Sequence, residues 1–179
     1  MKHEKFQNQY RIPSARLSNW DYGSNGMYFI TICTKDRNRY FGEIAEARDI
    51  PCLNMTEIGQ VANNHWVEIP KHFPFIELDE FIVMPNHVHG ILCVSKSKEE
   101  DWQPNQFGVQ RQNIPSVIRG YKASVKKYAT MNKIDFSWQT KYYDRIIRNE
   151  KELKNIRNYI FNNPMKWGDD RNNPENLYM

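Results

Sequence analysis

Two histidines one residue apart, His87 and His89, lie in the stretch FIVMPNHVHGIL at positions 81–92. The stretch is otherwise apolar and rich in β-branched residues, which is typical of a buried strand. Because successive side chains of a strand point to opposite faces, both imidazoles project from one face and could ligate one metal ion. An H-x-H pair is a weak signal by itself, since such histidines more often lie on a solvated face or bond to backbone.

A catalytic metal needs further ligands, with positions left open for water or substrate. A helix is predicted over 149–163, and on it Tyr159 and Asn163 are four residues apart, on the same face. An amide oxygen there could complete the metal site, with the phenol beside it. Asparagine also ends helices well, and here it stands just before Pro164. For Asn163 taken alone, the helix-ending explanation is the stronger of the two.

The elements that must position these groups follow from periodicity and turn residues. Residues 1–26 read as an irregular arm, and 35–54 as a connector with room for a hairpin excursion. The order β, α, β, β, α, β, α predicts an α+β, ferredoxin-like split βαβ fold, with an antiparallel sheet, helices on one face and a C-terminal helix that carries Tyr159. The predicted strands are 27–34, 76–85, 87–94 and 137–148, and the predicted helices are 57–69, 114–128 and 149–163.

The composition fits one domain, 1–179, with its own core. Cys33, Cys52 and Cys93 lie far apart and form no C-x-x-C pair, which predicts neither a disulfide framework nor a structural zinc site. A reduced, cytoplasmic protein is expected. No run approaches the roughly 20 apolar residues of a membrane span, and the start lacks the apolar core of a signal peptide, so no membrane is expected.

Basic and aromatic residues mix along 141–159, and the net charge is +4. Rings for bases and cations for phosphates are what single-strand binding requires. A solvated helix face beside core aromatics explains the same pattern equally well. The charge is compatible with a polyanionic partner but also occurs in many proteins that bind none.

Four stretches together form a more specific pattern: YFITICTKDR (28–37), ELDEFIVMPNHVHGIL (77–92), NIPSVIRGYKAS (113–124) and WQTKYYDRIIRNEKELKNIRNYIFNNPMKW (138–167). The combination resembles the bacterial REP-associated tyrosine transposases, which are HUH single-strand endonucleases, where U is a hydrophobic residue. The likeness covers nearly the whole chain and is far more specific than H-x-H alone.

The resemblance implies that His87 and His89 are metal ligands, that Asn163 is the third ligand and that Tyr159 is the nucleophile. It implies a divalent cofactor, Mg²⁺ or Mn²⁺, and cleavage and rejoining of DNA at palindromic hairpins through a 5′-phosphotyrosine. The expected partner is single-stranded or hairpin DNA, bound by a monomer or homodimer. The candidate DNA-binding residues are Arg11, Arg16, Arg37, Lys141, Arg145 and Arg148, although scattered surface charge also accounts for each of them.

Two other functions stay open from the sequence. One is a DNA-hairpin binding protein without catalytic activity, which would bind equally well without metal. The other is a metal phosphohydrolase that activates water rather than tyrosine and acts on small substrates.

Overall fold

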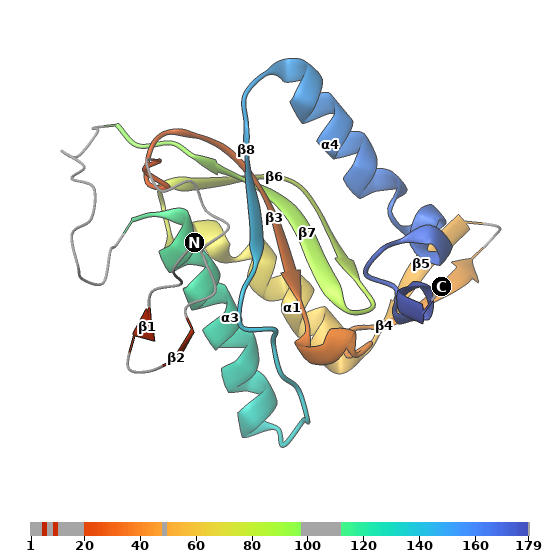
Figure 1. Ribbon diagram of the computed structural model, residues 1–179. Coiled ribbons are helices and arrows are strands. Elements are labelled where there is room, and N and C mark those ends of the chain that lie inside the picture. Colours follow the sequence, from red (N-terminus) through yellow and green to blue (C-terminus); the bar gives the residue numbers. More distant parts are fainter. Residues whose placement is uncertain (1–4, 7–8, 11–19, 48–49, 98–111, 179) are drawn as a thin grey trace.

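The computed structural model describes residues 5–6, 9–10, 20–47, 50–97 and 112–178. Its central element is a four-stranded antiparallel sheet with helices against it (Figure 1). The strands are β3 (Gly26–Cys33), β6 (Ile76–Met84), β7 (His87–Val94) and β8 (Tyr143–Ile147). The helices are α1 (Glu57–Val67), α2 (Ile69–His72), α3 (Ile114–Met131) and α4 (Glu150–Asn162).

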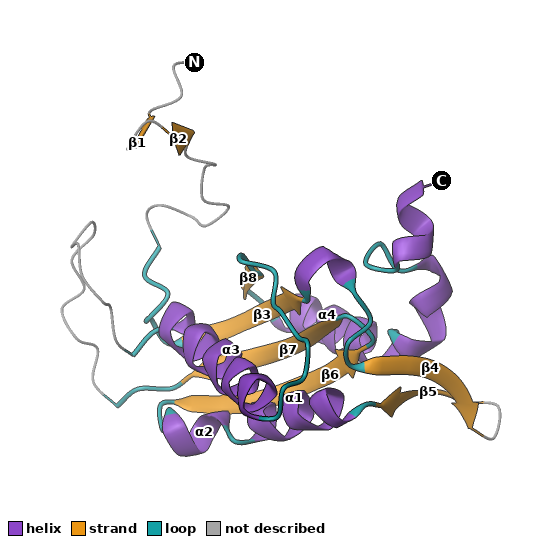
Figure 2. Ribbon diagram, turned by 90° about the horizontal axis from the view of Figure 1, so that it is seen from below, coloured by secondary structure: helices purple, strands orange, loops and turns teal. Residues whose placement is uncertain are grey.

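The strand order is β6-β7-β3-β8, with β7 and β3 in the centre. The chain therefore passes from β3 through α1 to β6 and leaves a space that β7 fills, which is the split βαβ arrangement. This confirms the predicted α+β fold with an antiparallel sheet. Both views show α1 and α3 on one side of the sheet, as expected, and α4 on the other (Figures 1 and 2).

The face under α1 and α3 holds the larger core. Along β7 it receives Val88, Gly90 and Leu92, none of them exposed to solvent. A Cβ added to Gly90 would lie 2.3 Å from the ring of Trp66 on α1, so only glycine lets this helix pack so closely. The glycine of the H-x-H-G stretch thus serves the face opposite the histidines.

Helix α4 packs on the other face through a narrow apolar stripe. Leu153 and Ile160 are its buried residues, seven apart, and they contact Phe29 and Ile91 of the central strands. Asn149 caps the helix, because its side chain accepts a hydrogen bond of 2.9 Å from the Glu152 backbone N–H. The apolar stripe thus holds α4, the helix that carries Tyr159, against the sheet.

Three features differ from or extend the expected elements. The last strand begins at Tyr143 rather than at 137, because the preceding residues only form the isolated bridge between Thr34 and Trp138. The connector forms a hairpin, β4 (Gly42–Ala47) with β5 (Ile50–Met55), which projects beyond the sheet (Figure 2). Beyond α4 the chain forms two short 3-10 helices, η2 (Pro164–Asp169) and η3 (Pro174–Tyr178).

Candidate metal centre and nucleophile

Strand β7 brings His87 and His89 onto one face, as the alternation predicted. Both side chains are completely buried, and their ring centroids are 4.4 Å apart. They lie opposite Cys33 and Thr31 of β3, in the centre of the sheet and beneath α4 and the chain that follows it. A rigid, doubly paired strand therefore sets the spacing of the two imidazoles.

Tyr159 reaches this pair from α4. Its hydroxyl lies 3.1 Å from Nε2 of His89, while the ring remains 40% exposed. On the other side of the same imidazole, Nδ1 lies 2.9 Å from the hydroxyl of Thr31. With the phenol donating to Nε2, Nδ1 carries the ring proton and donates it to Thr31. The predicted nucleophile is thus in direct contact with a predicted ligand, with one edge open to solvent.

The orientation of His87 is fixed by Asn86. The amide nitrogen of Asn86 donates to the carbonyl oxygens of Arg37 at 2.8 Å and Asn172 at 2.7 Å. Its oxygen must therefore face His87, where it accepts a hydrogen bond from Nδ1–H at 2.9 Å. Nδ1 then carries the proton, which leaves the lone pair of Nε2 for a ligand. No sequence pattern pointed to this role of Asn86.

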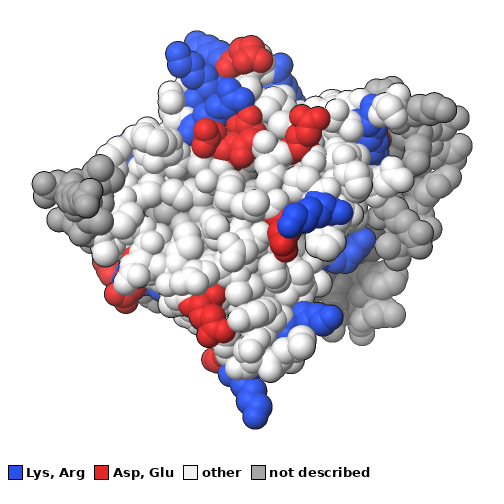
Figure 3. Space-filling view, turned by 180° about the vertical axis from the view of Figure 1, so that it is seen from behind, with Lys and Arg blue, Asp and Glu red and all other residues white. Residues whose placement is uncertain are grey.

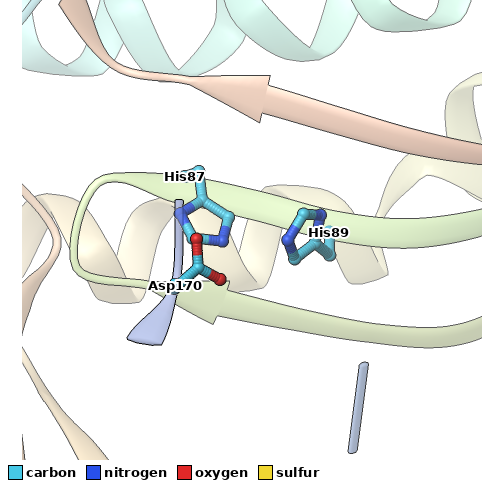
Figure 4. A group of neighbouring side chains, drawn as sticks. All are labelled: His87, His89 and Asp170. Atoms are coloured by element: carbon cyan, nitrogen blue, oxygen red, sulfur yellow. The ribbon is translucent and has the colours of Figure 1, made fainter. Parts of the chain in front are cut away.

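Asp170, which the sequence reasoning missed, joins the histidines from the C-terminal segment between η2 and η3. One ligand atom from each of His87, His89 and Asp170 lies within 4.8 Å of the others, and all three residues are buried. In Figure 4 the carboxylate of Asp170 extends from this segment toward the two imidazoles on β7. Oδ1 of Asp170 accepts a hydrogen bond of 2.6 Å from the Asn172 backbone N–H, which holds the carboxylate in place.

Asn163, the predicted third ligand, caps the C-terminus of α4 and is 2% exposed. Its amide nitrogen donates to Oδ2 of Asp170 at 3.2 Å. Its oxygen and Nε2 of His87 are both buried and have no hydrogen-bond partner among the described residues. Buried polar atoms without partners are costly, and a cation among two imidazoles, a carboxylate and an amide oxygen would satisfy them. The residues present therefore fit a divalent metal ion.

Burial sets the charge state of the histidines. It lowers the pKa of His87 to about 3, against an opposing effect of the Asn163 side chain. Burial, and then the neighbouring His87, hold the pKa of His89 well below its ordinary value. Both imidazoles are therefore neutral near pH 7, the state in which histidine binds metal.

The phenol of Tyr159 is harder to ionise than a free one. Burial raises its pKa first, and the carboxylate of Asp170 raises it further, while Asn163 and Arg171 act in the opposite direction. Arg157, two residues before Tyr159 on α4, is bound instead to Asp79 of β6 through two hydrogen bonds of 2.8 and 2.5 Å. Among the described residues, the groups that lower the pKa of the phenol are therefore Asn163 and Arg171, and not Arg157.

No protein-family model matches the chain. A Haemophilus influenzae protein described only as uncharacterized is 37% identical over 167 residues, which cover 88% of this chain and 91% of that protein. A second protein of the same organism, named "Putative REP-associated tyrosine transposase", is 24% identical over 159 residues, 85% of this chain and 78% of its own length. This similarity supports the resemblance to REP-associated tyrosine transposases that the sequence patterns indicate.

A solved REP-associated tyrosine transposase bound to a REP hairpin has the same fold as this chain. The TM-score is 0.60 at 18% identity, over 88% of this chain and 75% of that chain. A transposase-type α+β fold is thus shared across low sequence identity. Among the described residues, no helix is long and apolar enough to cross a membrane.

The predicted DNA-binding residues are distributed unevenly around the site. Arg145 lines the same hollow as Tyr159, whereas Arg37 donates to the carbonyl oxygen of Arg171. Seen from behind, Lys and Arg gather at the top of the molecule, the end where α4 begins in Figure 1, mixed with acidic groups (Figure 3). Lys141 and Arg148 are exposed, while Arg11 and Arg16 lie outside the described residues. All six stay predictions as DNA contacts.

Proposed function

We propose that this protein is a metal-dependent single-stranded DNA endonuclease and transposase that cuts and rejoins DNA at palindromic hairpins. The observation that carries the proposal is the contact of the Tyr159 hydroxyl, at 3.1 Å, with an imidazole of the buried histidine pair. A tyrosine beside a metal-ligand cluster suits covalent attack on a phosphodiester. The hairpin as substrate rests on the relative that was solved with a REP hairpin.

We assign His87 and His89 as metal ligands through Nε2, with oxygen ligands from Asp170 and Asn163. At His89 the ion would replace the hydrogen that the Tyr159 hydroxyl donates to Nε2. Nitrogen ligands suit Mn²⁺ better than Mg²⁺, while the carboxylate and the amide oxygen suit both. When bound, the ion would supply positive charge to the phosphoryl oxygens of the scissile phosphate. Asn86 and Thr31 keep the two imidazoles turned for this task.

In the proposed reaction the oxygen of Tyr159 forms a bond to phosphorus as the bond from phosphorus to the 3′ oxygen breaks. The phenol loses its proton and the leaving 3′ oxygen gains one. The product is a 5′-phosphotyrosine and a free 3′ hydroxyl. A covalent link stores the energy of the cut bond, so a 3′ hydroxyl can later attack it, release Tyr159 and restore a phosphodiester. Burial raises the pKa of the phenol, so a cation close to its oxygen would favour the attack.

The test is a labelled hairpin oligonucleotide with a single-stranded flank, incubated with the protein and Mn²⁺ and separated under denaturing conditions. A covalent adduct is expected with the unchanged protein and is lost in Tyr159→Phe. Tyr128→Phe is the matched control, because the Tyr128 hydroxyl binds Glu57 at 2.8 Å, far along the chain from the site, and this variant should keep the adduct. An adduct that persists in Tyr159→Phe overturns the assignment.

Two further measurements, hairpin binding in EDTA and hydrolysis of a simple phosphodiester, separate the two alternative functions. A catalytically inactive hairpin-binding protein would bind the oligonucleotide unchanged in EDTA and give no adduct with any divalent ion. A phosphohydrolase that uses water would hydrolyse a simple phosphodiester even as Tyr159→Phe.

A further inference from the structure

A hollow of about 510 Å³ lies beside the tyrosine, between β8 and α4. Tyr159 and Asn163 line it on one side, and Tyr143 and Arg145 of β8 line it on the other. Of the candidate metal ligands, Asn163 and Asp170 line the hollow, whereas His87 and His89 are not among its lining residues.

The wall of the hollow is aromatic. Phe29 is 7% exposed, and its ring centroid lies 6.1 Å from that of Tyr159 and 6.5 Å from that of Tyr143, edge-on to both. Tyr143 stays 44% exposed, although exposing an aromatic ring to water is unfavourable. A buried ring with an exposed tyrosine on each side gives the hollow an aromatic lining next to the nucleophile.

Cations border the aromatic surface. Arg145 follows Tyr143 by two residues on the same face of β8, and its side chain is 59% exposed although its Nε binds Glu152 at 2.6 Å. Lys166 and Arg171 line the hollow from the C-terminal segment and are exposed. Asp169 and Asp170 also line it and oppose these charges in part. An occupant with an apolar, planar part and a negative part fits this lining.

We propose that the hollow is a nucleotide subsite in which Tyr143 stacks on the unpaired base next to the scissile phosphate, while Arg145 binds the adjacent backbone phosphate. The inference rests on the proposed function, since the phosphate at Tyr159 fixes which nucleotide reaches Tyr143. Stacking on an aromatic ring tolerates all four bases, because every base has a π-face. The subsite therefore requires a single-stranded, unstacked nucleotide at this position rather than a particular base.

The test uses binding, not cleavage, and the Tyr159→Phe protein, so that the DNA stays intact. The probes are hairpin oligonucleotides with 2-aminopurine at one position each of the single-stranded flank, and matched oligonucleotides with an abasic nucleotide there. At one of these positions, 2-aminopurine fluorescence should be quenched on binding. The abasic nucleotide at that position should weaken binding about 5- to 100-fold, the range expected for one stacked base.

The double variant Tyr159→Phe/Tyr143→Ala should show no quenching and should bind the intact oligonucleotide more weakly by a similar factor. Its affinity for the abasic oligonucleotide should be no lower than its affinity for the intact one. Tyr143→Phe should retain both effects. Phe161→Ala is the matched control, because Phe161 is a 75% exposed aromatic residue of α4 that is not among those lining the hollow. Unfolding midpoints of all variants show whether the fold is kept.

The subsite would be overturned if the abasic nucleotide weakened DNA binding by Tyr143→Ala as much as it weakens binding by the protein that retains Tyr143. This holds even if the adduct with Tyr159 forms. If Tyr143 quenches 2-aminopurine but the unchanged protein forms no adduct, the proposed chemistry is wrong and the subsite is retained.

Discussion

The two faces of the central sheet are built in opposite ways from the same strands. Along β7, Val88 and Leu92 point into the large apolar layer under α1 and α3, whereas His87 and His89 point to the face under α4. The second face has a small apolar cluster and then a group of buried polar side chains. Stability thus resides mainly in one layer, which lets the other keep polar atoms without partners.

The largest effect on the fold is expected in the apolar layer. Trp66→Ala should lower the free energy of unfolding by about 3–5 kcal/mol, because a buried ring packed on Phe81 and Tyr121 leaves a large cavity. Leu153→Ala, under α4, should cost about 2 kcal/mol, the low end for leucine, because its cluster is small. Denaturant unfolding measures both. An equal cost at the two positions would contradict the division between the faces.

The polar layer should gain stability from metal. Mn²⁺ at about 100 times its dissociation constant should raise the free energy of unfolding by about 2.7 kcal/mol. His87→Ala should abolish this gain. Titration of Mn²⁺ into Asp170→Asn and Asn163→Ala compares the two candidate oxygen ligands. We expect the larger loss of Mn²⁺ affinity in Asp170→Asn, because this substitution removes a charge. A gain that survives in His87→Ala would place the ion elsewhere.

Asn86 should affect metal affinity without contacting the metal. Asn86→Ala removes the acceptor that fixes Nδ1–H of His87, so the dissociation constant for Mn²⁺ should rise about 10- to 100-fold. The free energy of unfolding without metal should be measured beside it, since the variant also frees the carbonyl oxygens of Arg37 and Asn172. Lower stability with unchanged metal affinity would show that Asn86 only supports the fold.

The smallest effect concerns the ion pair that ties α4 to β6. The hydrogen bond from Arg157 holds the pKa of Asp79 below its usual value of 3.8. A lowered folded pKa gives stability that is present above the unfolded value and is lost as the pH falls through the folded one. The difference in unfolding free energy between the unchanged protein and Asp79→Asn should therefore be constant near neutral pH and shrink below about pH 4. A difference independent of pH would exclude the ion pair as its cause.

The sequence by itself determined the order of elements, the strand that presents two imidazoles on one face and the helix that presents Tyr159 with Asn163. These features follow from local periodicity, because side-chain direction repeats every two residues in a strand and every 3.6 in a helix. The start of β8 was misplaced because 137–142 carry strand-like residues, whereas only Thr34 with Trp138 forms a bridge there. Pairing with β3, rather than composition, decides where that strand begins.

Only the tertiary structure decided which segments meet around the histidines. Asp170 lies in a short irregular segment after Pro164, where no period predicts the direction of a side chain, so its place beside β7 depends on contacts far apart in sequence. The role of Asn86 depends in the same way on carbonyl groups of Arg37 and Asn172. Local pattern fixes where a side chain points along its own element, but long-range packing fixes what it points at.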